Sequence, residues 1–137
     1  MPLDPTLVDD VKAWMRKSLN DALAAGVLIA AEPPLHEVAV YHCQQSVEKA
    51  LKAFLVSHDV PFRKTHELKE LGAQCLAVDA SLSAIVAEVS PLSHYAWEFR
   101  YPGDPSPLEE GEAANALALA RRLYDAVLER LPEECRP

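Results

Sequence analysis

Apolar residues recur at intervals of three and four along almost the whole chain, and this periodicity limits the fold more than any other feature. Such spacing places side chains on one face of an α-helix, whereas a half-buried strand needs alternation at every second residue. No segment of the sequence sustains that alternation. Prolines and glycines interrupt the periodic pattern and divide it into segments. The sequence therefore predicts helices at about 5–31, 35–58, 66–77, 81–99 and 109–131.

Local signals support several of these boundaries. Asp4 precedes a proline, and its carboxylate can accept hydrogen bonds from the free backbone N–H groups of a first helical turn. Thr65 is similarly placed to cap the third helix. Pro91 lies inside the fourth segment, where it either kinks the helix or restarts it with Ser90 as the cap. The closely spaced prolines of residues 101–108 exclude a helix there.

Length and composition agree with a single folded domain over residues 1–137. Half of the 137 residues are hydrophobic, which is enough for a real core. Helices joined by short links, without an internal repeat, predict an all-α, up-and-down bundle of four to five helices. The net charge of −8 repels phosphate polymers, so we exclude sequence-independent nucleic-acid binding over a broad basic surface. A local basic cleft is still compatible with this charge.

The cysteines and the N-terminus indicate a cytoplasmic protein. The three cysteines lack any Cys-x-x-Cys spacing, which is typical of free thiols in a reducing compartment. The N-terminus has no basic segment leading into an apolar one, so no signal peptide is expected. The longest apolar stretch, residues 22–31, is too short to span a bilayer. We therefore expect no membrane association.

The helix predicted at 35–58 carries more polar residues than folding requires. Tyr41, Gln45, Glu48 and Lys52 follow three-, four- and seven-residue steps and form one stripe, with Lys49 beside it. One interpretation is a solvated face with a Glu48–Lys52 ion pair. The other is that the stripe, opposite the apolar face, lines a cleft or a dimer seam.

Arg100 and His66 are further candidate site residues. Arg100, followed by Tyr101, lies where the fourth helix ends, and its guanidinium suits bidentate binding of phosphate or carboxylate. It could equally satisfy the last carbonyls of its own helix. The five histidines include no i,i+4 pair and no His-Glu-x-x-His motif, so neither a metal nor a cofactor is expected. His66 follows Thr65 at a helix start, where capping and loop packing are its expected role.

Three segments resemble the HEPN domain family in order and spacing. The stripe-bearing segment, residues 41–55, resembles the family's signature helix. Residues 65–68, Thr-His-Glu-Leu, resemble its Thr-His-x-Leu element. Tyr95 with Arg100-Tyr101-Pro102 resembles the Tyr and Arg-Tyr-Pro that close its penultimate long helix. The similarity covers about residues 7–131.

The resemblance implies a HEPN-type bundle that is usually a homodimer, often encoded beside a small nucleotidyltransferase in toxin–antitoxin-like pairs. Members have been regarded as nucleotide-binding, and many are metal-independent RNases that use an Arg followed, after four to six residues, by a His. Here no histidine occurs beyond His94, so Arg100 lacks that partner. Metal-free RNA cleavage needs proton transfers that a positioned histidine usually performs.

The leading hypothesis is therefore a non-catalytic HEPN module that acts as a homodimer and binds a nucleotide or a nucleotidyltransferase partner. Alternatives are a divergent RNase toxin that uses Arg100 with His66 or Tyr101, and a pure protein-interaction module. No catalytic residue is assigned, and binding is expected rather than enzymatic activity. Arg100 would contact phosphate, supplemented by the lysines, with Glu48 and Gln45 orienting them. The expected ligand-binding residues are Arg100, Tyr101, Lys52, Lys49, Glu48, Gln45 and His66.

Overall fold

The computed structural model describes residues 2–99, 102–103 and 107–137, and within these ranges the chain forms helices without any strand. The all-α prediction is therefore confirmed. Three short segments are 3₁₀ helices, labelled η. In chain order the elements are α1 (Pro5–Ala30), α2 (His36–Ser57), α3 (Leu68–Val78), η1 (Ala80–Leu82), α4 (Ser83–Val89), η2 (Ser90–Ala96), α5 (Glu112–Arg130) and η3 (Glu133–Cys135).

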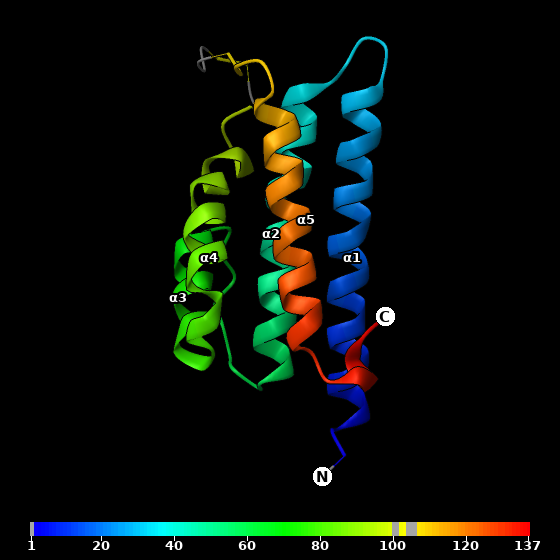
Figure 1. Cartoon of the computed structure of the whole chain (residues 1–137), viewed down its shortest axis with the longest axis vertical. Coiled ribbons are helices and arrows are strands. Elements are labelled where there is room, and N and C mark those ends of the chain that lie inside the picture. Colours follow the sequence, from blue (N-terminus) through cyan, green and yellow to red (C-terminus); the bar gives the residue numbers. More distant parts are fainter. Residues whose placement is uncertain (1, 100–101, 104–106) are drawn as a thin grey trace.

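Helix α2 is the central element of the bundle. It runs antiparallel to α1, with which it shares the largest interface, and it also packs against α5, α3 and η2. Figure 1 shows α5 lying in front of α2, with α1 on one side and the shorter helices α3 and α4 on the other. Both chain ends lie at the same end of the bundle, where η3 packs against α1. Because it is surrounded in this way, α2 buries residues on nearly all of its faces.

The apolar face of α2 forms the middle of the core. Val40, Cys43, Val47, Leu51 and Phe54 are completely buried, at the three- and four-residue steps that the sequence pattern predicts. Burying a side chain of the size of Leu or Phe stabilises a fold by about 1.5–3 kcal/mol. The core therefore fixes the rotation of α2 about its axis, and with it the direction in which the polar residues of α2 point.

Several predicted boundaries are found within a few residues. Asp4 caps α1 as expected, since its Oδ1 accepts a hydrogen bond from the Thr6 backbone N–H at 2.9 Å. Thr65 Oγ1 accepts from the Glu67 N–H at 3.0 Å, one turn before α3, but the residue at the N-cap itself is Glu67. The last helix begins at Glu112 rather than Glu109, because Gly111 adopts a left-handed conformation with φ of 80°.

Of the two alternatives for the segment predicted at 81–99, one kinked helix is wrong, and a restart at Pro91 is what the structure contains. The segment is divided into η1, α4 and η2, which change the hydrogen-bond pattern twice. Pro91 falls at the start of η2, where its missing N–H is tolerated. Ser90 does not cap this turn, since its Oγ donates back to the Val86 carbonyl at 2.7 Å. Tight 3₁₀ turns flanking one short α-helix therefore replace a long helix.

Candidate functional site

The polar stripe of α2 is mostly buried, and the chain that follows α2 covers it. Glu48 is 3 % exposed, Lys52 6 % and Gln45 8 %. After Ser57 the chain turns back beside α2, so that Phe62 approaches Lys52 and His66 approaches Glu48. The solvated-face interpretation is therefore wrong for these positions, although the expected Glu48–Lys52 pair is present.

The Glu48 carboxylate is the centre of this cluster. Its Oε2 accepts a hydrogen bond from Lys52 Nζ at 3.0 Å. Its Oε1 is 2.7 Å from Nδ1 of His66 and also accepts from Gln44 Nε2 at 3.3 Å. Gln45 Nε2 donates to Gln44 Oε1 at 2.7 Å and lies 3.5 Å from Glu48 Oε1. The low exposure of Glu48 is thus compensated by donors on both oxygens.

Lys52 is enclosed rather than presented to a ligand. Its ammonium lies 5.4 Å from the ring centroid of Trp14, on α1, and 5.6 Å from that of Phe62. The two rings meet edge to face with centroids 6.5 Å apart. A cation between aromatic rings is stabilised by their negative faces, more so when water is excluded. Lys52 therefore neutralises Glu48 inside the protein, whereas sequence reasoning expected it to contact phosphate.

His66 is the member of the cluster that reaches solvent. Its side chain is 54 % exposed, while Glu48 holds its Nδ1 and Gln44 Nε2 donates to its backbone carbonyl at 3.1 Å. Because a carboxylate only accepts hydrogen bonds, Nδ1 carries the hydrogen and Nε2 of the neutral ring is an acceptor. Among the described residues, none forms a hydrogen bond with this Nε2. The arrangement presents one oriented imidazole edge to solvent.

A second cluster of the same chemistry joins α1 to α2. Asp21 Oδ1 lies 2.8 Å from Nδ1 of His42, and its Oδ2 accepts from Lys49 Nζ at 2.6 Å. The side chains of His42 and Lys49 are 30 % and 22 % exposed. Sequence reasoning missed Asp21. A detectable signal was its place among the buried positions of α1, since Ala22 and Ala25 continue the same face.

The two clusters share one pattern, in which a largely buried carboxylate binds a lysine with one oxygen and a histidine Nδ1 with the other. In both clusters Nδ1 is held by the carboxylate, and the opposite edge of the imidazole ring, which carries Nε2, faces away from that carboxylate. An imidazole held in this way can accept or donate a proton, or donate a hydrogen bond to an anion when protonated. In the Asp21 cluster, the ammonium of Lys49 adds a positive charge near the His42 imidazole.

Two predicted residues cannot be compared with the clusters. Arg100 and Tyr101 fall outside the described residues. Tyr95, from the same motif, donates a hydrogen bond from its hydroxyl to Glu112 Oε2. Burial and this acidic partner raise the pKa of Tyr95 above its usual range. Tyr95 also lines a hollow of about 360 Å³ with Tyr41, Phe99 and the first turn of α2.

The described part of the chain offers neither a metal site nor an unpaired buried polar group that would point to a missing ligand. It contains no group of three or more His, Cys, Asp or Glu side chains that could hold a metal ion. It also leaves no buried side-chain nitrogen or oxygen without a hydrogen-bond partner. Among the described helices, none combines the length and the apolar character that crossing a membrane requires.

Comparison with curated proteins and with solved structures finds no match for the chain. Comparison with protein families does find one. The model of the HEPN domain matches residues 11–131, a span that includes α1 from Val11 onward, both carboxylate clusters and all of α5. Nearly the whole chain is matched, in agreement with the all-helical fold. The chain therefore belongs to the HEPN domain family.

Proposed function

We propose that this protein is a nucleotide-binding HEPN module that acts as a homodimer beside a small nucleotidyltransferase in a toxin–antitoxin-like pair. The observation that supports the ligand site is the contact between Glu48 and His66, which orients an imidazole edge toward solvent. An enclosed carboxylate that fixes an exposed imidazole is an arrangement well suited to binding or proton transfer.

The proposed ligand is a mononucleotide rather than a polynucleotide. The chain carries a net charge of −8, so a long phosphate polymer meets overall repulsion. A single nucleotide needs only a few local donors. His66 supplies one at its Nε2 when the ring is protonated, and the Lys49 ammonium lies in the neighbouring cluster. The guanidinium of Arg100 is proposed as the phosphate contact. Glu48 and Gln45 then act by holding His66 rather than by touching the ligand.

Calorimetric titration with ATP, GTP and AMP tests this proposal. We expect binding by the wild type, weakened about tenfold or more in His66→Ala and in Arg100→Ala, since each loses a hydrogen bond to a charged group. His36→Ala is the matched control, because His36 is an exposed histidine at the start of α2 and belongs to neither cluster. Absence of heat with all three nucleotides at millimolar concentration would overturn the proposal.

The nucleotidyltransferase partner is proposed from family membership. Co-expression with the product of an adjacent gene, followed by light scattering, checks it. A stable complex whose mass equals the sum of both proteins is the expected result. An adjacent gene of unrelated chemistry, together with no complex formation, would contradict the pairing.

The Glu48–His66 pair also favours a second candidate function, a divergent metal-independent RNase. In that reaction a base removes the proton of a ribose 2′-hydroxyl, the 2′-oxygen forms a bond to phosphorus, and the bond from phosphorus to the 5′-oxygen breaks as that oxygen receives a proton. His66 Nε2 is an oriented proton acceptor for the first step, and Arg100 would stabilise the charged phosphorus centre.

Incubation with total RNA in the presence of EDTA separates this candidate from simple binding. Cleavage that is lost in His66→Ala and in Arg100→Ala, but kept in His36→Ala, is the expected result for an RNase. Strong expression should then also slow bacterial growth. Unimpaired growth together with intact RNA would remove the RNase from consideration and leave nucleotide binding.

A further inference from the structure

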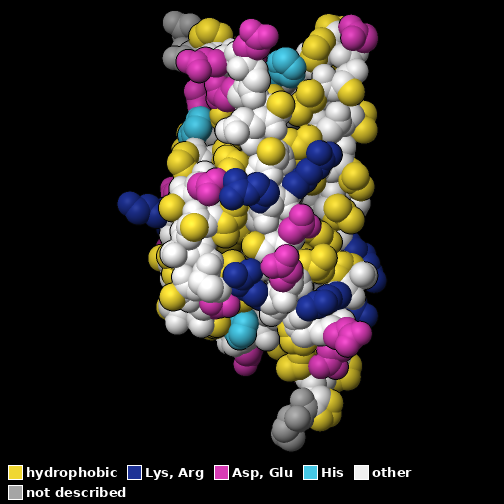
Figure 2. Space-filling model, viewed as in Figure 1, with side chains coloured by type: hydrophobic (Ala, Val, Ile, Leu, Met, Phe, Trp, Pro, Cys, Tyr) yellow, Lys and Arg dark blue, Asp and Glu magenta, His cyan; other side chains and the backbone are white. Residues whose placement is uncertain are grey.

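Helix α1 leaves an apolar stripe uncovered along the C-terminal half of one face. Leu19, Leu23 and Val27 follow one another at four-residue steps and are 40, 54 and 70 % exposed. Figure 2 shows hydrophobic atoms gathered along the upper part of α1. Of the other exposed large apolar residues in the described chain, Leu35 and Val38 lie at the start of α2, Val78 lies on α3 and Trp97 follows η2. The stripe is the longest such alignment on one helix.

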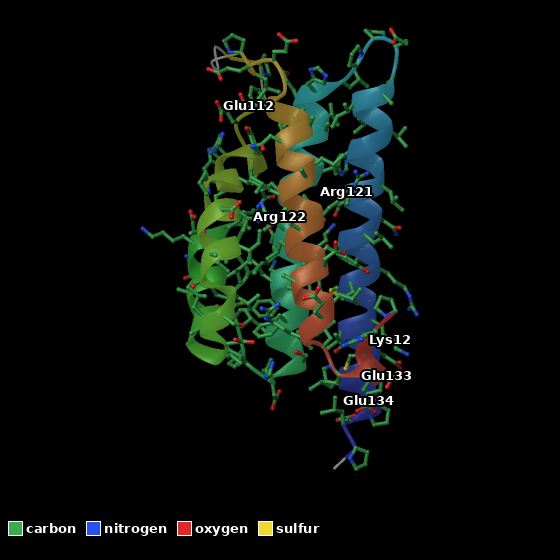
Figure 3. All side chains as sticks on the ribbon, in the orientation of Figure 1. Lys12, Glu112, Arg121, Arg122, Glu133 and Glu134 are labelled. Carbon is green, nitrogen blue, oxygen red and sulfur yellow. The ribbon has the colours of Figure 1, made fainter. Side chains whose placement is uncertain are left out.

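Near its N-terminus, the same face of α1 is partly covered by the C-terminal segment of the chain. Residue 12 precedes the stripe at helical spacing, and in Figure 3 Lys12 lies beside Glu133 and Glu134, where η3 packs against α1. Nothing in the described chain continues this cover over Leu19, Leu23 and Val27. The C-terminal half of this face therefore remains exposed to solvent. Contiguous exposed apolar surface often marks an interaction site.

Two residues of α5 with opposite charges, Arg121 and Asp125, border the apolar stripe. Arg121 and Asp125 line a hollow of about 220 Å³ with Leu19 and Leu23, and Arg121 lies close to Gly26. Figure 3 shows Arg121 between α5 and α1. Neither charged side chain forms an ion pair or a side-chain hydrogen bond with any other described residue. Opposite charges four residues apart on one helix suit pairing with an antiparallel copy of that helix.

We propose that the surface formed by Leu19, Leu23, Val27, Arg121 and Asp125 binds a second copy of this chain. A two-fold axis that crosses α1 and α5 near Leu23 makes each helix antiparallel to its copy. Leu19 then faces Val27 of the partner subunit, and Arg121 faces Asp125 of the partner subunit, each contact occurring twice. This inference rests on the dimer of the proposed function and assigns the surface that forms it.

A hydrophobic stripe edged by charges is the composition expected of such an interface. Leucine and valine side chains supply the water-excluding centre, while the arginine and aspartate fix the register at the rim. The α1–α5 surface also leaves His66 and His42 accessible, since these side chains belong to clusters that involve α2, the loop after it and the other side of α1.

Sedimentation equilibrium of the full-length protein tests the interface. The wild type is expected to be a dimer, and Leu23→Glu should raise its dissociation constant about 100-fold, since a charge buried on a two-fold axis meets its own copy. Val78→Glu is the matched control and should leave the dimer intact, because Val78 is similarly exposed on α3. Circular dichroism melts confirm that both variants fold, as expected for exposed positions.

A charge exchange tests the register independently of the apolar stripe. Arg121→Asp places like charges opposite each other and should weaken the dimer about tenfold. Adding Asp125→Arg to the same chain restores opposite charges and should return the dissociation constant to within about threefold of the wild type. Failure of the double variant to recover would overturn the antiparallel register.

The remaining outcomes separate this inference from the proposed function. A wild type that stays monomeric at millimolar concentration would overturn both the interface and the dimer. Nucleotide binding would then still be tested separately by the calorimetric titration. A dimer unaffected by Leu23→Glu would overturn this interface alone. A monomer that forms a complex with the nucleotidyltransferase, lost in Leu23→Glu, would assign the surface to that protein and overturn self-association.

Discussion

Glu48 pairs with two basic side chains at once. It neutralises Lys52, which is 6 % exposed, and it orients His66. Glu48→Gln keeps the size of the side chain but leaves the Lys52 ammonium without its counterion. Losing one partner of a buried pair costs about 3–5 kcal/mol, so urea unfolding at pH 7 should show a loss of that order.

The control for this variant is Glu70→Gln. Glu70 pairs with Arg63 at 2.7 Å, but the Arg63 side chain is 71 % exposed. Exposed pairs contribute little because water and salt screen them. A Glu48→Gln loss no larger than that of Glu70→Gln would show that the Lys52 pair is not electrostatically buried.

The hydrogen bond from Tyr95 to Glu112 predicts a pH dependence of stability. Tyr95, and then the Glu109 backbone N–H, lower the pKa of Glu112 below its usual value by binding its ionised form. A lowered pKa in the folded state means stability that is present above the unfolded pKa and is lost as pH falls. The stability difference between wild type and Tyr95→Phe should therefore be constant above about pH 5 and shrink toward pH 3. Chemical unfolding across this range measures it, and a difference that does not shrink would contradict the assignment.

At the scale of elements, the contact of α3 with α4 depends on one glycine. A Cβ built on Gly72 would lie 2.6 Å from Cγ1 of Val86. Gly72→Ala gains helix propensity of about 1 kcal/mol, but overpacking of a close contact costs about 1–3 kcal/mol. Because Val86 is 5 % exposed and cannot swing into solvent, we expect net destabilisation, measured as a lower thermal midpoint.

The double variant Gly72→Ala with Val86→Ala is the control. Removing the Val86 methyl groups makes room for the new Cβ, so its loss of stability should be smaller than the sum of the two single losses. Additive losses would show that the two positions do not compete for space.

The helices could be predicted from sequence to a large extent, but their 3₁₀ turns could not. The periods of α1 and α2 run over six or more turns, so their apolar faces define them. Between Ala80 and Ala96 each turn is too short for a period to distinguish α from 3₁₀ spacing. In this segment the local packing decides between α and 3₁₀ hydrogen bonding. Pro91 indicated that the helix changes there, but it did not indicate that a 3₁₀ helix follows.

The candidate site was predictable in part for a similar reason. Spacing along α2 predicted that Gln45, Glu48 and Lys52 lie together, which the structure confirms. It could not predict that Phe62 and Trp14 close over Lys52, because those contacts come from a loop and from another helix. The same limit explains why Asp21 was missed, since its partners are 21 and 28 residues away.

For the molecule as a whole, the thiols report whether the bundle opens. Burial raises the pKa of Cys43 and of Cys75 to about 12, so neither is a thiolate at neutral pH in the folded protein. At pH 8 we expect a disulfide reagent to label Cys43 and Cys75 only after the protein unfolds. Cys135, held in η3 near the chain end, should react first. Mass spectrometry of labelled peptides gives the order, and rapid native labelling of Cys43 would contradict the packed core.

The extensive pairing of α1 with α2 has a consequence for the order in which the chain folds. These helices are consecutive, and the turn between them is short, so their contacts close with little loss of chain entropy. Helix α5 must return from beyond residue 111 to join them. The folding transition state should therefore contain the α1–α2 hairpin, with φ-values highest near Met15 and Val47 and lowest near Leu123. The same hairpin would then form early during synthesis, before the C-terminal helix has left the ribosome.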